Sequence, residues 1–410
     1  MKVLIVAASF ASSISGVQRH ALNVARCLLL LPEISEVHLV VAPWQSDLTQ
    51  RAGLPSDLRL KTHVAGLNHT ALSRNMWYWH RLPEFAVQLN ADLVHLSYPM
   101  PLNRRAFPCP TVVTLHDLYP YEIPMNFGFP KFIFNRIVLQ QCLRASDAIA
   151  CVSSATRMRL TQYAPAAVCE RATTIYNCID EGPLAANESP IPGWNNEPFL
   201  LCVAQHRRNK NIPTLIRAFD LLIGFGGIAA NAKLVVIGTQ GPETQSLHRL
   251  ANNKQLKGCV HFLEGLSEPQ LQWCYRHCEA LVAPSLTEGF DLPVAEGLLA
   301  GCRIVCSDIA AHREVAGDRC RFVALRENAA QDLAAAIVDT LKCSKPQPIA
   351  LPLFSAPVVS HQYLALYCGL IESSSPKLAR KAVGGCLGAS AESVAVTVPE
   401  DNSALACRGR

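Results

Sequence analysis

The sequence predicts an α/β protein with two Rossmann-like, doubly wound parallel-sheet domains that face a central cleft. Three observations support this fold class. Short apolar runs alternate with longer amphipathic runs, the alternation stops once near the middle of the chain, and it then starts again. Continuous apolar runs are typical of strands buried on both faces, as in parallel sheets covered by helices. A chain of 410 residues is long enough for two such domains.

The first half of the chain supplies one sheet, in a domain that we place at residues 1–182. Its expected strands are 2–8, 36–42, 91–97, 111–116, 148–153 and 172–176, and its expected helices are 17–31, 75–89, 131–145 and 154–163. The alternation ends in DEGPLAANESPIPGWNNEP, which is rich in Pro, Gly, Asn and acidic residues. Such a composition is typical of an interdomain linker, which we place at residues 183–198.

The second half repeats the pattern in a domain that we place at residues 199–345. Its expected strands are 199–204, 233–237, 259–263, 280–283, 302–306 and 321–325, and its expected helices are 212–222, 243–253, 268–278, 292–300 and 328–342. Residues 346–372 are expected to form a crossover segment that ends in a helix at 358–372. The last stretch, 373–410, is rich in Ala, Ser, Gly and Val and is expected to be a mobile tail.

Composition narrows the class of protein further. The net charge is +5 and no basic tract is present, so nucleic acid is not an expected partner. The 17 cysteines show no metal-ligand spacing, which favours buried thiols in a reducing compartment. The N-terminal apolar run is interpreted as a first strand rather than a signal peptide, and no run is long enough to span a membrane. We expect a cytoplasmic protein that is soluble or peripheral at the membrane face, although no amphipathic anchor stands out.

Ligands of open parallel sheets bind beyond the carboxyl ends of the strands. Gly16 lies in a small polar loop after the first strand, where backbone N–H groups could approach a phosphate, or the loop could be an ordinary turn. His116 and Asp117 end the strand at 111–116. A neutral histidine there could hydrogen-bond a sugar hydroxyl, and the alternative is a structural histidine held by a loop carbonyl.

A basic cluster follows the strand at 199–204. Arg207, Arg208 and Lys210 precede a helix, where cations oppose the helix dipole. A bound anion such as a diphosphate would compensate for this placement. A solvated charge run is the alternative.

Two acids lie in SLTEGFDLPVAEGLLAGCRIVCSD, with Glu288 in a loop and Glu296 one turn into a helix. The N–H groups near Phe290, Asp291 and Leu292 should point into the cleft, because the proline that follows suits a first helical turn. Carboxylates accept hydrogen bonds from paired hydroxyls, so the two acids could hold the two ends of a sugar nucleotide. Alternatively, Glu288 favours the helix dipole and Glu296 is a surface residue.

The ordered set of motifs resembles the retaining glycosyltransferase family 4, which has the GT-B fold. The E-x7-E motif is Glu288–Glu296, and CVHFLEGLSEPQLQWCYRHCEALVAPS before it and HREVAGD after it also match. The SG loop, TLHDL, VSS and IYNCID fall in family order in the first half, so the resemblance covers about residues 1–345. The late helix resembles the segment that crosses back to the first domain.

The resemblance implies roles for these residues. Glu288 would contact the donor sugar with the backbone of residues 290–292, and Glu296 would bind the ribose hydroxyls. Lys210, with Arg207 or Arg208, would neutralise the diphosphate. His116, with Asp117 nearby, would lie on the sugar and acceptor side in the first domain, Gly16 would lie by the phosphates, and Phe262–Ser267 would border the base. Several positions depart from the family pattern: Ala204, Gln205, Glu264, Cys178, Asp291, which adds a carboxylate near the sugar pocket, and His361.

These features predict transfer of a hexose, with mannose among the candidates, from a GDP- or UDP-sugar to a hydroxyl of a glycan or lipid-linked acceptor. Retention at the anomeric carbon is expected, and no metal or other cofactor is expected because cationic side chains can stabilise the leaving diphosphate. The alternatives are a sugar-nucleotide epimerase of the same architecture and a non-catalytic sugar-nucleotide-binding protein. Products would distinguish the epimerase, and binding without turnover would indicate the binding protein.

Overall fold

The computed structural model describes residues 1–10, 16–46, 54, 56–179 and 185–374. Residues Met1–Ser374 form one compact unit. The predicted tail falls outside the described residues from position 375 onward, as do the first two residues of the predicted linker. None of the helices in the described ranges is both long enough and apolar enough to cross a membrane.

The first domain is built on a parallel sheet whose described strands run in the order β3-β2-β1-β4-β5-β6-β7. The interior strand β1 pairs on both sides, so that Val3 lies opposite Val37 and Leu93. Strands β1, β4, β5 and β6 are mostly apolar and almost entirely buried, which explains why they were recognisable in the sequence. The strands are β1 (Lys2–Val6), β2 (Glu36–Val41), β3 (Leu60–Val64), β4 (Leu93–Leu96), β5 (Thr111–Leu115), β6 (Ala148–Cys151) and β7 (Ala172–Thr174).

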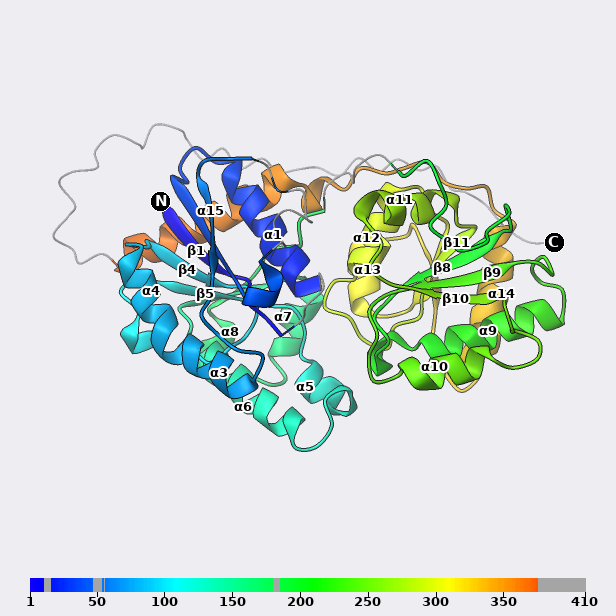
Figure 1. Cartoon of the computed structure of the whole chain (residues 1–410), viewed down its shortest axis with the longest axis horizontal. Helices are drawn as coiled ribbons and strands as arrows, with labels where there is room; N and C mark the ends of the chain where they lie inside the picture. Colours follow the sequence, from blue (N-terminus) through cyan, green and yellow to red (C-terminus); the bar gives the residue numbers. More distant parts are fainter. Residues whose placement is uncertain (11–15, 47–53, 55, 180–184, 375–410) are drawn as a thin grey trace. The chain divides into compact units, whose positions relative to one another are not determined.

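Helices cover both faces of this sheet (Figure 1). One apolar core joins the sheet to α1 and α15, and a second core joins its other face to α4 and α6. The helices of this domain are α1 (Gly16–Leu29), α3 (Ala71–Met76), α4 (Leu82–Gln88), α5 (Tyr119–Glu122), α6 (Lys131–Ala145), α7 (Ser154–Leu160) and α8 (Ala166–Cys169). Short 3-10 turns occur at Pro43–Gln45, Arg104–Ala106 and Pro124–Asn126.

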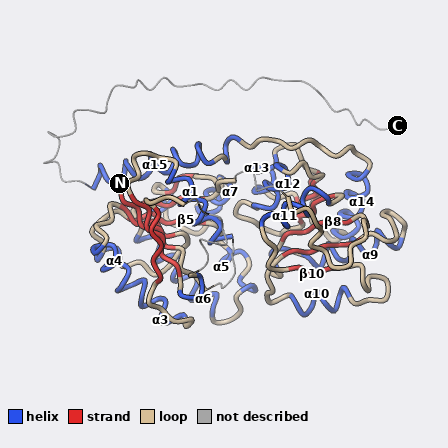
Figure 2. Tube along the Cα trace, turned by 45° about the horizontal axis from the view of Figure 1, so that its top comes forward, coloured by secondary structure: helices blue, strands red, loops and turns tan. Residues whose placement is uncertain are grey.

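The second domain repeats the arrangement around a parallel sheet with the strand order β10-β9-β8-β11-β12-β13 in the described residues. Its strands are β8 (Phe199–Val203), β9 (Lys233–Ile237), β10 (Val260–Leu263), β11 (Ala280–Ala283), β12 (Ile304–Ser307) and β13 (Arg321–Val323). Its helices are α9 (Ile212–Gly224), α10 (Thr244–Ala251), α11 (Glu268–His277), α12 (Leu292–Leu299), α13 (Ala310–Ala316) and α14 (Ala329–Leu341), with 3-10 turns at Arg208–Lys210 and Pro352–Phe354. The helices flank the strands of both sheets (Figure 2), so the predicted fold class is confirmed.

The last described helix, α15 (Ala356–Ser374), packs against α1 of the first domain, as predicted for a segment that crosses back. It joins a buried hydrogen-bond chain beneath the sheet. The Tyr367 hydroxyl lies 2.6 Å from Nδ1 of His95, and Nε2 of His95 lies 2.8 Å from Oγ1 of Thr114. Thr114 also lies 3.0 Å from Nε2 of His20, whose Nδ1 lies 2.7 Å from the amide oxygen of Asn177. Every member is satisfied if both imidazoles are neutral, which fits their complete burial.

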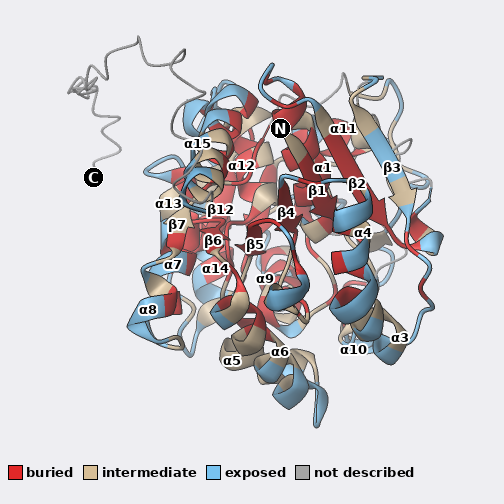
Figure 3. Cartoon of the chain, turned by 90° about the vertical axis from the view of Figure 1, so that its left-hand side faces the viewer, coloured by how far each residue is buried: buried red, intermediate tan, exposed pale blue. Residues whose placement is uncertain are grey.

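All the predicted strands are present, but the sequence reading missed β3. Its residues are all exposed or half-buried because it lies at the sheet edge, so it lacks the apolar run of the central strands (Figure 3). The predicted helix at 75–89 is also divided. A π-helical turn at Trp77–Arg81 separates α3 from α4, and Pro83 lies in the first turn of α4.

The buried histidines predict acid sensitivity. Burial lowers the pKa of His95 to about 3, whereas an unfolded histidine titrates near 6.5, so the unfolded chain binds more protons as the pH falls through this window. The free energy of unfolding should therefore fall by about 2 kcal/mol for this residue between pH 7 and pH 5. Urea unfolding at both pH values should show that the His95→Gln variant loses correspondingly less free energy of unfolding than the parent. The exposed His80→Gln is the control, and equal pH dependence of His95→Gln and the parent would contradict this prediction.

Candidate active site

A cavity of about 740 Å³ receives loops from the carboxyl ends of strands in both sheets. Most of the residues selected from the sequence line it: Gly16, His116, Asp117, Lys210, Glu288, Phe290, Asp291, Leu292 and Glu296. Arg207 and Arg208 do not belong to the lining, and Arg208 is exposed. The roles of all these residues stay predictions, but their convergence defines the candidate site.

Lys210 and Glu288 form a largely buried ion pair at the centre of this lining. Nζ of Lys210 donates to Oε1 of Glu288 over 2.5 Å, and the Tyr119 hydroxyl donates to Oε2 over 3.0 Å. Burial opposes the charge on Lys210, but Glu288 and Asp291 outweigh it and raise the pKa of Lys210. The cavity therefore keeps a cation, held by a carboxylate whose two oxygens are both occupied.

The loop before α9 sets the position of Lys210. Asn211 adopts a left-handed conformation with φ of 51°, which asparagine tolerates better than most residues. Its side-chain amide donates to the carbonyl of Pro284 over 3.2 Å, and Leu286 N–H donates to the carbonyl of Asn209 over 2.7 Å. The loop is thereby fixed to the segment that leads from β11 to Glu288.

Gly289 lies where the loop after β11 meets the first domain. A Cβ atom added at Gly289 would lie 1.7 Å from the carbonyl oxygen of His116, so no larger residue fits without a shift of the backbone. The Gly289 carbonyl accepts hydrogen bonds from the hydroxyls of Ser153 and Thr156, the latter over 3.1 Å. Arg159 of α7 also donates to the Glu288 carbonyl over 2.5 Å. Residues of the first domain thus hold the turn that carries Glu288.

Asp291, the extra carboxylate, is buried and paired with His312 of α13. Nε2 of His312 donates to Oδ2 of Asp291 over 2.7 Å, and its Nδ1 lies 2.8 Å from the carbonyl of Ser307. Burial opposes ionisation of both groups, but their mutual hydrogen bond raises the pKa of His312 and lowers that of Asp291. The carboxylate therefore reaches the cavity with its charge already balanced.

His116 and Asp117 are half-buried, and the partial loss of solvent alters the ionisation of both. Nε2 of His116 donates to the Ser97 carbonyl over 2.8 Å, and burial lowers its pKa to about 4. The ring is thus neutral, with Nδ1 as an acceptor, so the structural and the functional interpretations of this histidine are compatible. Burial also raises the pKa of Asp117 to about 6, although its Oδ1 accepts from Tyr119 N–H over 3.1 Å.

Glu296 is not the surface residue of the alternative interpretation, since 12% of its side chain is exposed. Its Oε1 accepts from Arg19 over 2.5 Å and its Oε2 accepts from the Tyr275 hydroxyl over 2.7 Å. Arg19 also pairs with Glu268. Glu296 chiefly raises the pKa of Arg19, so this arginine of α1 brings a second fixed cation to the cavity.

The predicted base-binding segment divides into two parts. Gly265, Leu266 and Ser267 line the cavity. Phe262 does not belong to the lining, and its ring packs against His206 and His248, with centroids 5.3 and 4.5 Å apart. Residues 265–267 are therefore the part placed to meet a ligand.

Arg19, Tyr119 and Gly238 are among the lining residues that sequence reasoning missed. Gly238 leaves no room for a Cβ atom, which would lie 2.0 Å from the Ala204 carbonyl oxygen. Gly238 could have been found, because it directly follows a buried strand, as the predicted site residues do. Arg19 offered no comparable signal, because its acidic partners lie more than 240 positions away. Within the described ranges, no group of three or more His, Cys, Asp or Glu residues is placed to hold a metal ion.

Two parallel-sheet domains whose loops share one cavity are the arrangement of the GT-B fold. The family model described as "Glycosyl transferases group 1" matches residues 186–348, and the one described as "Glycosyltransferase Family 4" matches residues 14–182. Together the two models cover most of the chain. The chain therefore belongs to glycosyltransferase family 4.

Relatives agree with this assignment, and a solved structure agrees with the fold. The chain is 22% identical to the O-antigen chain mannosyltransferase B of Escherichia coli, over 78% of this chain and 85% of that protein. It is 23% identical to the O-antigen chain mannosyltransferase RfbU of Salmonella typhimurium strain LT2, over 70% of this chain and 78% of that protein. Anabaena Alr3699/HepE, solved in complex with UDP-glucose, superposes with a TM-score of 0.63 at 16% identity, covering 91% of this chain and 99% of that one. The last likeness supports the fold alone.

Gly289→Ala should strongly impair the protein, because the added methyl group would overlap the His116 carbonyl. The turn that carries Glu288 must then move, so the melting temperature and any sugar-transfer activity should both fall. Gly369→Ala is a matched control, since a Cβ there meets nothing within 4 Å and alanine favours the helical conformation. A Gly289→Ala variant with the parent's melting temperature would show that the contact is not as close as the structure has it.

Proposed function

We propose that the protein transfers a hexose from a nucleoside-diphosphate sugar to a hydroxyl group of a glycan or lipid-linked acceptor, with retention at the anomeric carbon. The observation that carries this proposal is the buried Lys210–Glu288 pair beside the Gly289 turn. A fixed cation and a hydroxyl-binding carboxylate in one cavity suit a ligand that has both a diphosphate and a sugar.

The proposed roles follow the position of each group in the cavity. Lys210 would stabilise the leaving diphosphate, Glu288 and the backbone of residues 290–292 would hold the sugar, and Glu296 would bind the ribose. Gly16, at the start of α1, would let the phosphates approach the helix N-terminus. Arg207 and Arg208 would assist only if the loop that carries them moved toward the diphosphate. His116 and Asp117 would face the sugar and the acceptor.

The proposed reaction breaks the bond between the anomeric carbon and the diphosphate oxygen and forms a bond from the same face to the acceptor oxygen. The departing diphosphate takes the acceptor proton, and the transition state has oxocarbenium character. New negative charge on the diphosphate is stabilised by groups placed in advance, chiefly Lys210. We propose that no metal is required, because this cation supplies the stabilisation.

Mannose is the first donor sugar to test. Two relatives are named as O-antigen chain mannosyltransferases, which supports a mannosyl donor and a polysaccharide product. GDP-mannose is the donor that we propose to assay first. A UDP-hexose is the second candidate, since a structural neighbour was solved with UDP-glucose. Assay of both donors with glycan and lipid-linked acceptors, with products identified, tests the proposal. Conversion of one sugar nucleotide into another without an acceptor would instead indicate an epimerase.

Lys210→Ala and Glu288→Ala should each lower the rate of transfer by at least about 100-fold, because each removes a group proposed to act in the transition state. Lys61→Ala is the matched control. It removes a lysine from an exposed ion pair with Glu36, whose charged atoms are 2.6 Å apart. Circular dichroism verifies that each variant is folded. Near-normal turnover by a folded Lys210→Ala variant would refute the role of Lys210.

Glu296→Ala should raise the donor KM by about tenfold or more and change kcat less, because a carboxylate that holds ribose hydroxyls acts in binding throughout the reaction. The exposed Glu327→Ala is the control. Steady-state kinetics with the best donor makes the measurement. An equal loss in kcat at unchanged KM would place Glu296 in the chemical step instead.

A further inference from the structure

A stretch of the first domain has an unusual charge composition. From Ile123 to Ser146 the chain contains no Asp or Glu, but it contains Lys131, Arg136 and Arg144. Acids and bases are nearly balanced in the whole chain, with 32 acidic and 37 basic residues. This stretch is therefore a local positive region in a protein of small net charge.

The same stretch exposes apolar side chains. Met125, Phe129, Ile133, Phe134 and Ile137 are 68%, 82%, 40%, 63% and 59% exposed. Ile137 follows Ile133 and Phe134 by four and three positions on α6, so these three side chains share one helix face. Single exposed apolar residues are ordinary, but a contiguous group usually marks an interaction site.

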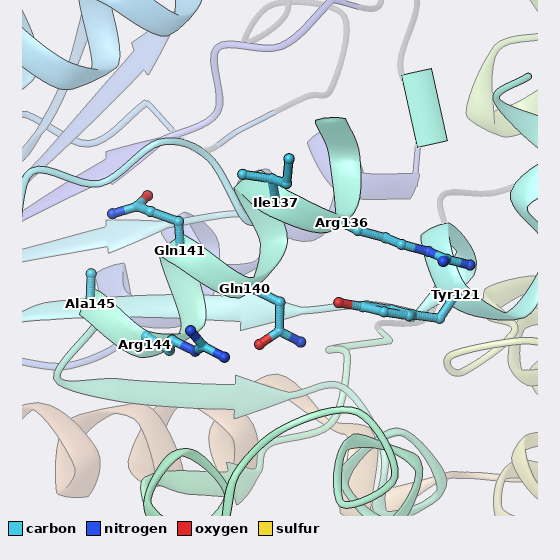
Figure 4. Close-up of a pocket in the computed structure, with 7 residues that line it drawn as sticks. All are labelled: Tyr121, Arg136, Ile137, Gln140, Gln141, Arg144 and Ala145. Atoms are coloured by element: carbon cyan, nitrogen blue, oxygen red, sulfur yellow. The ribbon is translucent and has the colours of Figure 1, made fainter. Parts of the chain in front are cut away.

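A groove of about 610 Å³ is lined by Ile137 with other residues of α6, and by Tyr121 of α5 (Figure 4). Its lining includes Tyr121, Arg136, Ile137, Gln140 and Arg144 and contains no carboxylate. Arg136 lies over the Tyr121 ring, 4.8 Å from its centroid, and its Nε donates to the Pro120 carbonyl over 2.8 Å. This leaves guanidinium N–H groups of Arg136, and the exposed Arg144, beside the apolar face.

We propose that this surface, defined by the exposed apolar residues 125–137 with Lys131, Arg136 and Arg144, docks on an anionic lipid bilayer. The apolar side chains would enter the boundary between headgroups and acyl chains, and the cations would meet lipid phosphates. The absence of acidic residues fits a negatively charged surface, which would repel carboxylates. None of these residues lines the candidate active site, so the surface would position the protein without taking part in catalysis.

The test is sedimentation of the full chain with vesicles. Phosphatidylcholine vesicles that contain about 30% phosphatidylglycerol should bind the protein, phosphatidylcholine alone should bind it much less, and salt should weaken the binding. No donor sugar is present, so the result is independent of the proposed transferase activity. Equal binding to both vesicle types, or none to either, would overturn the proposal.

Two double variants separate the contributions. Phe134→Ser with Ile137→Ser removes apolar insertion, and Lys131→Glu with Arg144→Glu reverses charge. Each should lower the vesicle partition coefficient about tenfold or more. The controls lie in the second domain: Phe225→Ser, at a side chain that is 60% exposed, and the exposed Lys257→Glu. Unchanged partition of either folded double variant would overturn the proposal.

Hydrogen exchange gives a second measurement that needs no variant. Amides within residues 123–146 should exchange more slowly when anionic vesicles are added, whereas those of α9 and α10 should not change. Protection confined to another segment would show that a different surface binds lipid.

Light scattering tests whether the surface instead binds a second copy of the chain. A dimer that Phe134→Ser with Ile137→Ser converts to monomer, with vesicle binding unchanged, would show that the surface is a dimer interface.

Discussion

The candidate site depends on a lysine that stays charged in a place largely removed from water. Lys210 can do so because Glu288 lies within hydrogen-bond distance, and Glu288 in turn depends on the Tyr119 hydroxyl. Removing one partner of such a pair leaves an uncompensated buried charge, so neither residue is free to vary alone. Tyr119 comes from the first domain and the ion pair from the second. The charge at the centre of the cavity is thus maintained by both domains.

The Gly289 turn shows why backbone contacts matter as much as charge at this site. The turn packs against the His116 carbonyl so closely that only glycine fits, and two hydroxyls of the first domain hold its own carbonyl. Behind His116, the ring of His20 packs edge-on with centroids 4.8 Å apart, and His20 belongs to the neutral histidine chain under the sheet. An uncharged, buried core therefore supports the His116 backbone, against which the Gly289 turn packs.

Features that neighbouring residues encode could be predicted from the sequence, whereas features that depend on contacts between distant residues could not. Buried central strands and the residues directly after them are encoded locally, and this identified the fold and most of the cavity, including Lys210, Glu288 and Glu296. The edge strand β3 lacked an apolar run, because one side of an edge strand has no neighbour. Arg19 and Tyr119 could not be assigned, since their partners are distant in sequence and become neighbours only through the fold. His312 was visible within a matched motif, but its pairing with Asp291 required coordinates.

The two glutamates of the E-x7-E motif have the same kind of environment: each accepts from one cation and from one tyrosine hydroxyl. A ligand hydroxyl that binds Glu296 would compete with Arg19, and a guanidinium left alone in the cavity would be costly. Glu268 removes this difficulty, because it pairs with Arg19 independently of Glu296. Under the proposed function, the ribose can thus gain its carboxylate while Arg19 keeps a counter-charge. At the other glutamate, Lys210 would gain the anionic diphosphate as a partner as Glu288 turns to the sugar. In both cases the cation that loses its glutamate keeps or gains another anion as a partner. Binding therefore leaves no buried ion unpaired.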